Sequence, residues 1–154
     1  MERFQGKPIF GGQAAGPALI ARLPMNFTAS FTKPKNIFPW WRDRIQDRHH
    51  DLFGKEIRNR VLIYPATIGS TYTGMVLLDL IAKGGGPAAL IVGRADPLMA
   101  AGPILARVWF AKNVAVVEYE GDDLLSRVRE GDRISVNGRT GQIDLDNTAS
   151  SGLC

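Results

Sequence analysis

The chain has 154 residues, 45% hydrophobic and 22% charged, with a net charge of +4, which fits a single domain, 1–154, with its own core. Its one cysteine, Cys154, excludes a disulfide framework and a thiolate metal cluster, so a reducing, cytoplasmic setting is expected. No apolar stretch can span a bilayer, and a mild basic excess alone does not indicate nucleic acid.

The first elements are two strands followed by a long irregular segment. Residues 7–22, KPIFGGQAAGPALIAR, predict strand, glycine-rich turn and strand. Residues 24–58 combine prolines, clustered aromatics and many charges, which predicts a loop with short turns. Since long loops in compact domains are commonly functional or interfacial, we expect this variable aromatic and charged loop to be a functional segment or an interface.

The middle of the sequence alternates buried strands with helices. RVLIYPA, residues 60–66, predicts a buried strand ended by Pro65, and TGMVLLDLIAKGG predicts a helix that stops at Gly84. AALIVG predicts the next strand, and DPLMAAGPILARV a short helix or turn capped by Asp96.

The remaining residues complete a mixed sheet. VAVVEYE predicts a third buried strand, DDLLSRVRE a short helix, and DRISVNGRTGQIDLD a β-hairpin around Asn137 and Gly138. The tail, 147–154, is expected to fray. Strands, strand–helix–strand units and a closing hairpin together predict an α/β or α+β domain with a mixed sheet and a few flanking helices.

The segment TIGSTYTG, residues 67–74, is the main candidate site. A glycine-bearing turn between a strand and a helix presents free N–H groups and the positive end of the helix dipole, which favour an anion. Ser70, Thr71 and Thr73 add hydroxyl groups, and Gly69 allows close approach to a ligand. The alternative is that these hydroxyl groups only cap the helix.

Two further pairs stand out in the long loop. His49 and His50 are adjacent, and adjacent side chains do not converge on one metal in a regular element, so we expect a solvated or interface feature and no metal site. Trp40 and Trp41 are also adjacent, and at least one is a candidate anchor for a partner protein. The alternative is that both tuck against the sheet.

Residues 60–106 carry a resemblance to a known family. A strand ending in proline, a glycine-serine loop, a helix, PAA before the next strand, an acidic residue and a glycine-alanine stretch follow one another. FGGQAAGPAL and IQDRHHDLFGKEI, upstream, add to the pattern. In these features the chain resembles the small subunit, or swivel domain, of the aconitase X family.

The resemblance implies a swivelling β/β/α fold with a barrel-like β part, and a subunit of a hydro-lyase that is inactive without a large subunit. The large subunit carries the iron–sulfur cluster, and this chain binds no cofactor. The implied substrate is a small hydroxy acid resembling mevalonate 5-phosphate or cis-3-hydroxy-L-proline. The implied proton acceptor is Ser70, with Gly69, Thr71, Tyr72 and Thr73 around the substrate.

The chain departs from the family pattern at its loop. Ile68 stands where the family usually has a basic residue, and a different sequence, SFTKPKNIFPWWRDR, replaces an upstream glycine-rich segment. Either the substrate therefore differs from those of the best-known members, or Lys35, Arg42 or Arg44 supplies the positive charge from the altered loop. Two other readings stay open: a non-catalytic binding module on the same fold, and a nucleic-acid binder, which the interleaved aspartates disfavour.

Overall fold

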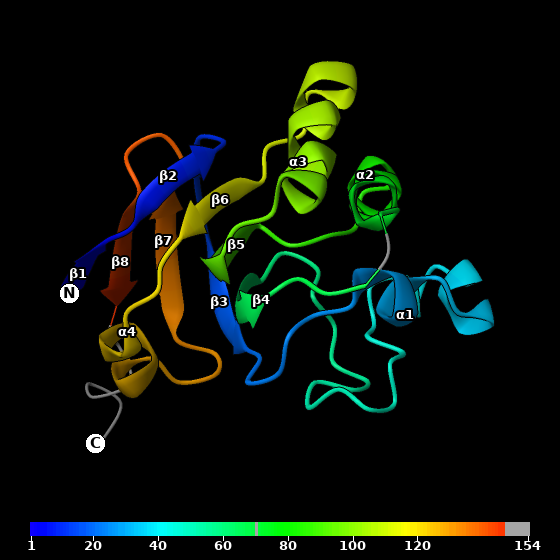
Figure 1. Ribbon diagram of the computed structural model, residues 1–154, viewed down its shortest axis with the longest axis horizontal. Helices are drawn as coiled ribbons and strands as arrows, with labels where there is room; N and C mark the ends of the chain where they lie inside the picture. Colours follow the sequence, from blue (N-terminus) through cyan, green and yellow to red (C-terminus); the bar gives the residue numbers. More distant parts are fainter. Residues whose placement is uncertain (70, 147–154) are drawn as a thin grey trace.

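The computed structural model describes residues 1–69 and 71–146, and its framework is an eight-stranded mixed sheet (Figure 1). The strand order is β1-β8-β7-β3-β4-β5-β6-β2. The strands are β1 (Glu2–Gln5), β2 (Lys7–Phe10), β3 (Gln13–Ile20), β4 (Val61–Ala66), β5 (Ala89–Arg94), β6 (Ala115–Glu118), β7 (Arg133–Asn137) and β8 (Gln142–Asp146).

The centre of the sheet is parallel and its flanks are antiparallel. Strands β3, β4, β5 and β6 run parallel to one another, whereas β7, β8 and β1 continue one side antiparallel and β2 pairs antiparallel with β6. The continuous apolar runs of β4 and β5 are buried on both faces, as expected for parallel strands covered on each side. The parallel arrangement sends the ends of β3 to β6 to one edge of the sheet.

Helices connect and cover the parallel strands. They are α1 (Phe27–Phe31), the 3-10 turn η1 (Pro34–Ile37), α2 (Thr73–Ala82), α3 (Pro97–Phe110) and α4 (Asp122–Arg127). The carboxylate of Asp96 accepts a hydrogen bond from the Leu98 N–H at 2.8 Å, which caps α3 as predicted. Helix α2 ends before Gly84, whose φ of +84° is accessible to glycine without strain.

Two apolar cores lie on the two faces of the central strands. One packs α1, α2 and α3 against the sheet and contains Phe27, Leu62, Leu77, Leu90 and Met99. The other lies between the central strands, the β7–β8–β1 flank and α4, so the sheet curls around it (Figure 1). The predicted mixed sheet with a barrel-like β part and a few flanking helices is therefore confirmed.

The structure adds three features to the predicted elements. Strand β1 was not predicted, because only Phe4 of its four residues is buried and it forms by pairing with β8. Helix α3 is a full 14-residue helix rather than a short helix or turn. Residues 24–58 contain α1 and η1 in addition to turns, and they pack Phe27 and Ile45 into the core.

His50 corrects the expectation that the two histidines form a solvated or interface feature. His49 is exposed, but His50 is only 6% exposed. Its Nδ1 accepts the Leu52 N–H at 3.0 Å, and its Nε2 lies 3.2 Å from the Leu23 carbonyl oxygen, to which it donates in that tautomer. The ring is a structural crosslink within the loop.

The described helices contain no segment long and apolar enough to cross a membrane. The tail at 147–154 lies outside the described residues, so its fraying stays a prediction, as does the single-domain organisation of 1–154.

Candidate functional site

The ends of the parallel strands gather the candidate residues at one edge of the sheet. Arg22 follows β3, the segment 67–72 follows β4, Arg94 ends β5, and residues 119–121 follow β6. Ligands of open α/β sheets bind at this carboxyl edge, because loops from several strands meet there. The predicted glycine-serine loop therefore lies at the edge most suited to a binding site.

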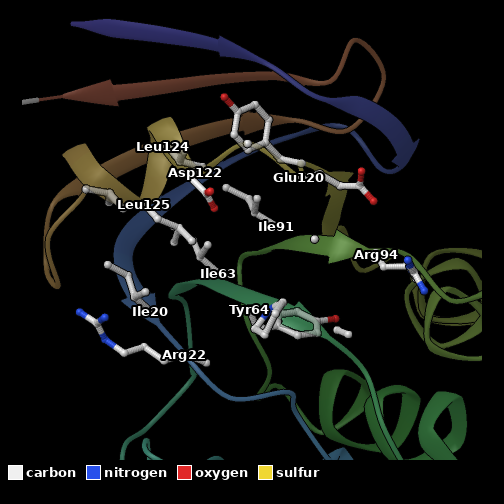
Figure 2. Close-up of a pocket in the computed structure, with 17 residues that line it drawn as sticks. Ile20, Arg22, Ile63, Tyr64, Ile91, Arg94, Glu120, Asp122, Leu124 and Leu125 are labelled. Carbon is white, nitrogen blue, oxygen red and sulfur yellow. The ribbon is translucent and has the colours of Figure 1, made fainter.

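A pocket of about 640 Å³ opens at this edge, between β3–β6 and α4 (Figure 2). Its floor is apolar, formed by Ile20, Ile63, Ile91, Leu124 and Leu125. Its charged lining residues are two arginines and two acids: Arg22, Arg94, Glu120 and Asp122. Pro65 and Ala66, which lead into the glycine-serine loop, complete one side, so the loop departs from the pocket's rim.

The first part of the glycine-serine loop is held by backbone contacts. Met25 pairs with Thr67 in a parallel bridge, and the Ile68 N–H donates to the Met25 carbonyl at 2.9 Å. Gly69 has φ +106° and lies against the Asn26 side chain. Ser70, the predicted proton acceptor, lies outside the described residues.

The other predicted loop residues divide between surface and interior. Gly69, Thr71 and Tyr72 are exposed, whereas Thr73 is 2% exposed within the first turn of α2. Tyr72 is the N-cap residue of α2, and its side chain makes no capping hydrogen bond. The loop thus presents polar groups to solvent, and their predicted contacts with substrate stay a prediction.

The three predicted anion contacts lie around Trp41 and the far end of α2. The guanidinium of Arg42 donates to the carbonyl of Lys83 at 3.3 Å, just after the end of α2. Arg42 and Tyr72 both line one pocket along α2, so the structure brings these two predicted residues together. Lys35 and Arg44 each lie 5.3 Å from the centre of the Trp41 ring.

Arg22 and Arg94 are the cations that the structure places at the carboxyl edge, and the sequence analysis did not select them. Each follows an apolar run that predicts a buried strand, so each stands where such a strand leaves the core. A basic residue directly after a buried strand was therefore a signal that the sequence offered. To use it, one also needs the strand order, which places β3 and β5 on either side of β4.

Two tyrosines lie at this edge, and both keep their protons at neutral pH. Burial raises the pKa of Tyr64 well above its usual value, against the smaller effect of a hydrogen bond from the Thr67 hydroxyl at 3.3 Å. Burial, and the hydrogen bond to Asp123 at 2.5 Å, raise the pKa of Tyr119 to about 12. Neither phenol is therefore suited to accept a proton.

The chain's side chains do not fit an iron–sulfur cluster. Such clusters are held by several cysteine thiolates, and the sequence has one cysteine, Cys154. Among residues 1–69 and 71–146, no three His, Cys, Asp or Glu side chains gather as metal ligands.

Comparisons with known proteins agree with this architecture. The chain is 29% identical over 143 residues to the phosphomevalonate dehydratase small subunit of Methanocella arvoryzae, covering 93% of this chain and 98% of the relative. It is 31% identical over 143 residues to the subunit of the same name from Methanosarcina mazei, covering 93% and 90%.

Two solved structures share the fold. The crystal structure of Thermococcus kodakaraensis aconitase X in its holo-form superposes with a TM-score of 0.79 at 24% identity, covering 96% of this chain and 100% of that one. The solution NMR structure of a UPF0107 protein gives a TM-score of 0.77 at 25% identity, covering 95% and 100%. The profile of the aconitase X swivel domain matches residues 3–145, and the chain therefore belongs to the aconitase X swivel-domain family.

Proposed function

We propose that this chain is the small subunit of an aconitase X-type dehydratase, which removes water from a small anionic hydroxy acid once a large subunit is bound. The observation that carries the proposal is the match to phosphomevalonate dehydratase small subunits over nearly their whole length. Those names favour a substrate resembling mevalonate 5-phosphate over one resembling cis-3-hydroxy-L-proline. The iron–sulfur cluster of the assembly belongs to the large subunit in this proposal.

Dehydration removes a proton from one carbon while hydroxide leaves the next carbon, so it needs a base on the proton's side. We assign this role to the hydroxyl of Ser70. A serine hydroxyl is a weak base, and it acts as one only where amide N–H groups and positive charge stabilise its alkoxide. The start of α2 offers such groups, because the first N–H groups of a helix lack intrahelical partners.

Ser70→Ala in the assembled enzyme tests this assignment. We expect turnover to fall by about 10²- to 10⁴-fold, the usual contribution of a positioned base. Assembly and unfolding midpoint should stay unchanged. Ser126→Ala is the matched control, because Ser126 is exposed on α4 and, among the described residues, its hydroxyl bonds only to the Asp123 carbonyl within that helix. Normal turnover of Ser70→Ala would refute the role of Ser70.

A non-catalytic interaction module is the second candidate, and the exposed aromatic surface of the long loop favours it. Phe38 and Trp40 are 50% and 68% exposed and stack at 5.5 Å. Ile68, also exposed, replaces the loop's usual basic residue. Absence of dehydration by the reconstituted pair, with tight binding of the large chain retained, would favour the module over the enzyme.

A further inference from the structure

Arg94 lies beside the residue from which the glycine-serine loop departs. In the parallel register of β4 and β5, Arg94 is opposite Ala66. Neighbouring strands lie about 5 Å apart. The two strand ends are packed tightly, because a β-carbon on Gly93 would lie only 2.6 Å from the Pro65 carbonyl oxygen. The backbone of Arg94 is therefore fixed relative to the start of the loop.

The Arg94 side chain lies on the loop's side of the pocket. Figure 2 shows its guanidinium and the Tyr64 hydroxyl on the same side, away from Leu124 and Leu125. The Tyr64 hydroxyl accepts a hydrogen bond from Thr67. The guanidinium thus lies on the side of the pocket that carries the Tyr64 hydroxyl, rather than over the apolar floor.

The charge of Arg94 is not neutralised by a bonded counterion. Its side chain is exposed, and no hydrogen bond or ion pair joins the guanidinium to any residue within 1–69 or 71–146. Two nearby carboxylates are committed to backbone groups. Glu118 accepts the Ala95 N–H at 2.8 Å, and Asp96 caps α3. A five-donor cation is therefore available at the loop.

The glycine-serine loop itself carries no cation. Residues 66–74 contain neither lysine nor arginine, and Ile68 is 51% exposed. An anion at the loop would have only amide dipoles and hydroxyls to bind. Arginine matches carboxylate and phosphate geometry with two parallel hydrogen bonds. Arg94, at the end of the neighbouring strand β5, thus supplies the positive charge that the loop lacks.

We propose that Arg94 binds the carboxylate or phosphate of the substrate and sets the enzyme's preference for an anion. This assignment rests on the proposed function, and it makes Arg94 a specificity residue that acts beside the glycine-serine loop. The pocket of about 640 Å³ has room for the rest of a small substrate. Glu120 and Asp122 balance the two arginines among the charged lining residues, so Arg94 accounts for one anionic group of the substrate.

The first test measures kinetics of the assembled enzyme with Arg94→Gln, Arg94→Lys and Arg139→Gln. Arg139 is the matched control, because it is exposed on the β7–β8 turn at the opposite edge of the sheet. Loss of a charged hydrogen-bonded pair predicts that Arg94→Gln raises KM about 10- to 100-fold with a smaller change in kcat. Arg94→Lys should recover part of the affinity, and Arg139→Gln should match wild type. An unchanged KM for Arg94→Gln would overturn the assignment.

The second test follows backbone amide signals of the isolated full chain by NMR during titration with inorganic phosphate, and separately with acetate. We expect saturable shifts at residues 67–72 and 94–96 that Arg94→Gln abolishes and Arg139→Gln keeps. The anion that binds with the lower Kd shows whether the site prefers a phosphate or a carboxylate group. Absence of saturable shifts in wild type, or their persistence in Arg94→Gln, would overturn the proposal. Because this test needs no turnover, it decides the role of Arg94 even if the assembled protein does not dehydrate any hydroxy acid.

Discussion

Asn26 and Gly69 lie against each other where the glycine-serine loop crosses the start of α1. The Asn26 carboxamide oxygen accepts the Ala29 N–H at 3.0 Å, which caps α1. A β-carbon at position 69 would lie 2.7 Å from that same oxygen. The loop thus rests on a capped helix end, and its path depends on the missing side chain of Gly69.

Gly69→Ala should therefore destabilise the protein more than an ordinary glycine substitution. The positive φ alone costs about 1 kcal/mol, and the contact with Asn26 should add about 1–3 kcal/mol or displace the loop. Gly131→Ala is the control, since Gly131 has a φ of +91° but open space around it. Chemical denaturation of both variants measures the difference. Equal losses of unfolding free energy would show that the Asn26 contact does not constrain the loop.

Asp43→Asn should weaken the attachment of the long loop to the rest of the domain. The Asp43 side chain is 2% exposed and accepts a hydrogen bond from the Arg58 guanidinium, which is 39% exposed. The loss should be about 1–3 kcal/mol, below that of a fully buried pair, because Arg58 can regain water.

Asp79→Asn provides the comparison for Asp43→Asn. It breaks the exposed Lys83–Asp79 pair of 2.9 Å on α2, which should cost less than about 0.5 kcal/mol. Urea unfolding of the two variants at neutral pH measures both effects. A loss from Asp43→Asn no larger than that from Asp79→Asn would contradict a structural role for the buried carboxylate.

Tyr64 should make the protein sensitive to alkali. Its pKa is raised in the folded state, mainly by burial, so the unfolded chain releases this proton first. The contribution of protonated Tyr64 to the unfolding free energy is complete below about pH 10. As pH rises above this value, the unfolding free energy falls by about 1.4 kcal/mol per pH unit. Unfolding free energies from pH 8 to 11 should show a shallower decline for Tyr64→Phe. If the unfolding free energies of wild type and Tyr64→Phe fell equally with pH, ionisation of Tyr64 would not be the cause of the alkaline sensitivity.

The two tryptophans should respond differently to truncation. Trp41 contacts the cations of Lys35 and Arg44, whereas Trp40 is 68% exposed and stacks on Phe38. Trp41→Ala should cost about 1–2 kcal/mol of stability, and Trp40→Ala less than about 0.5 kcal/mol. If Trp40 anchors the large subunit, Trp40→Ala should instead weaken assembly by about tenfold or more. Thermal unfolding and a pull-down titration separate the two effects.

The sequence by itself determined the elements of the central sheet. Continuous apolar runs predict β4, β5 and β6, and helical spacing ended by glycines predicts α2, whereas α3 was predicted only as a short helix or turn with Asp96 as its cap. These signals are local. A strand buried on both faces needs apolar residues along its own length, and a helix end needs a capping residue within its own segment. The glycine-serine loop between β4 and α2 was accordingly found from sequence alone.

Tertiary structure decided which distant residues meet. Strand β1 forms by pairing with β8, over 130 residues away, and its own sequence has too little apolar pattern to predict it. The sequence suggested Lys35, Arg42 and Arg44 as cations for the substrate. The structure places Lys35 and Arg44 over Trp41, and Arg42 in a pocket with Tyr72, and their contact with a substrate stays a prediction. Arg94 lies opposite Ala66, the residue from which the loop departs, because β4 and β5 are parallel neighbours in a fixed register, and no window of sequence contains this non-local relationship.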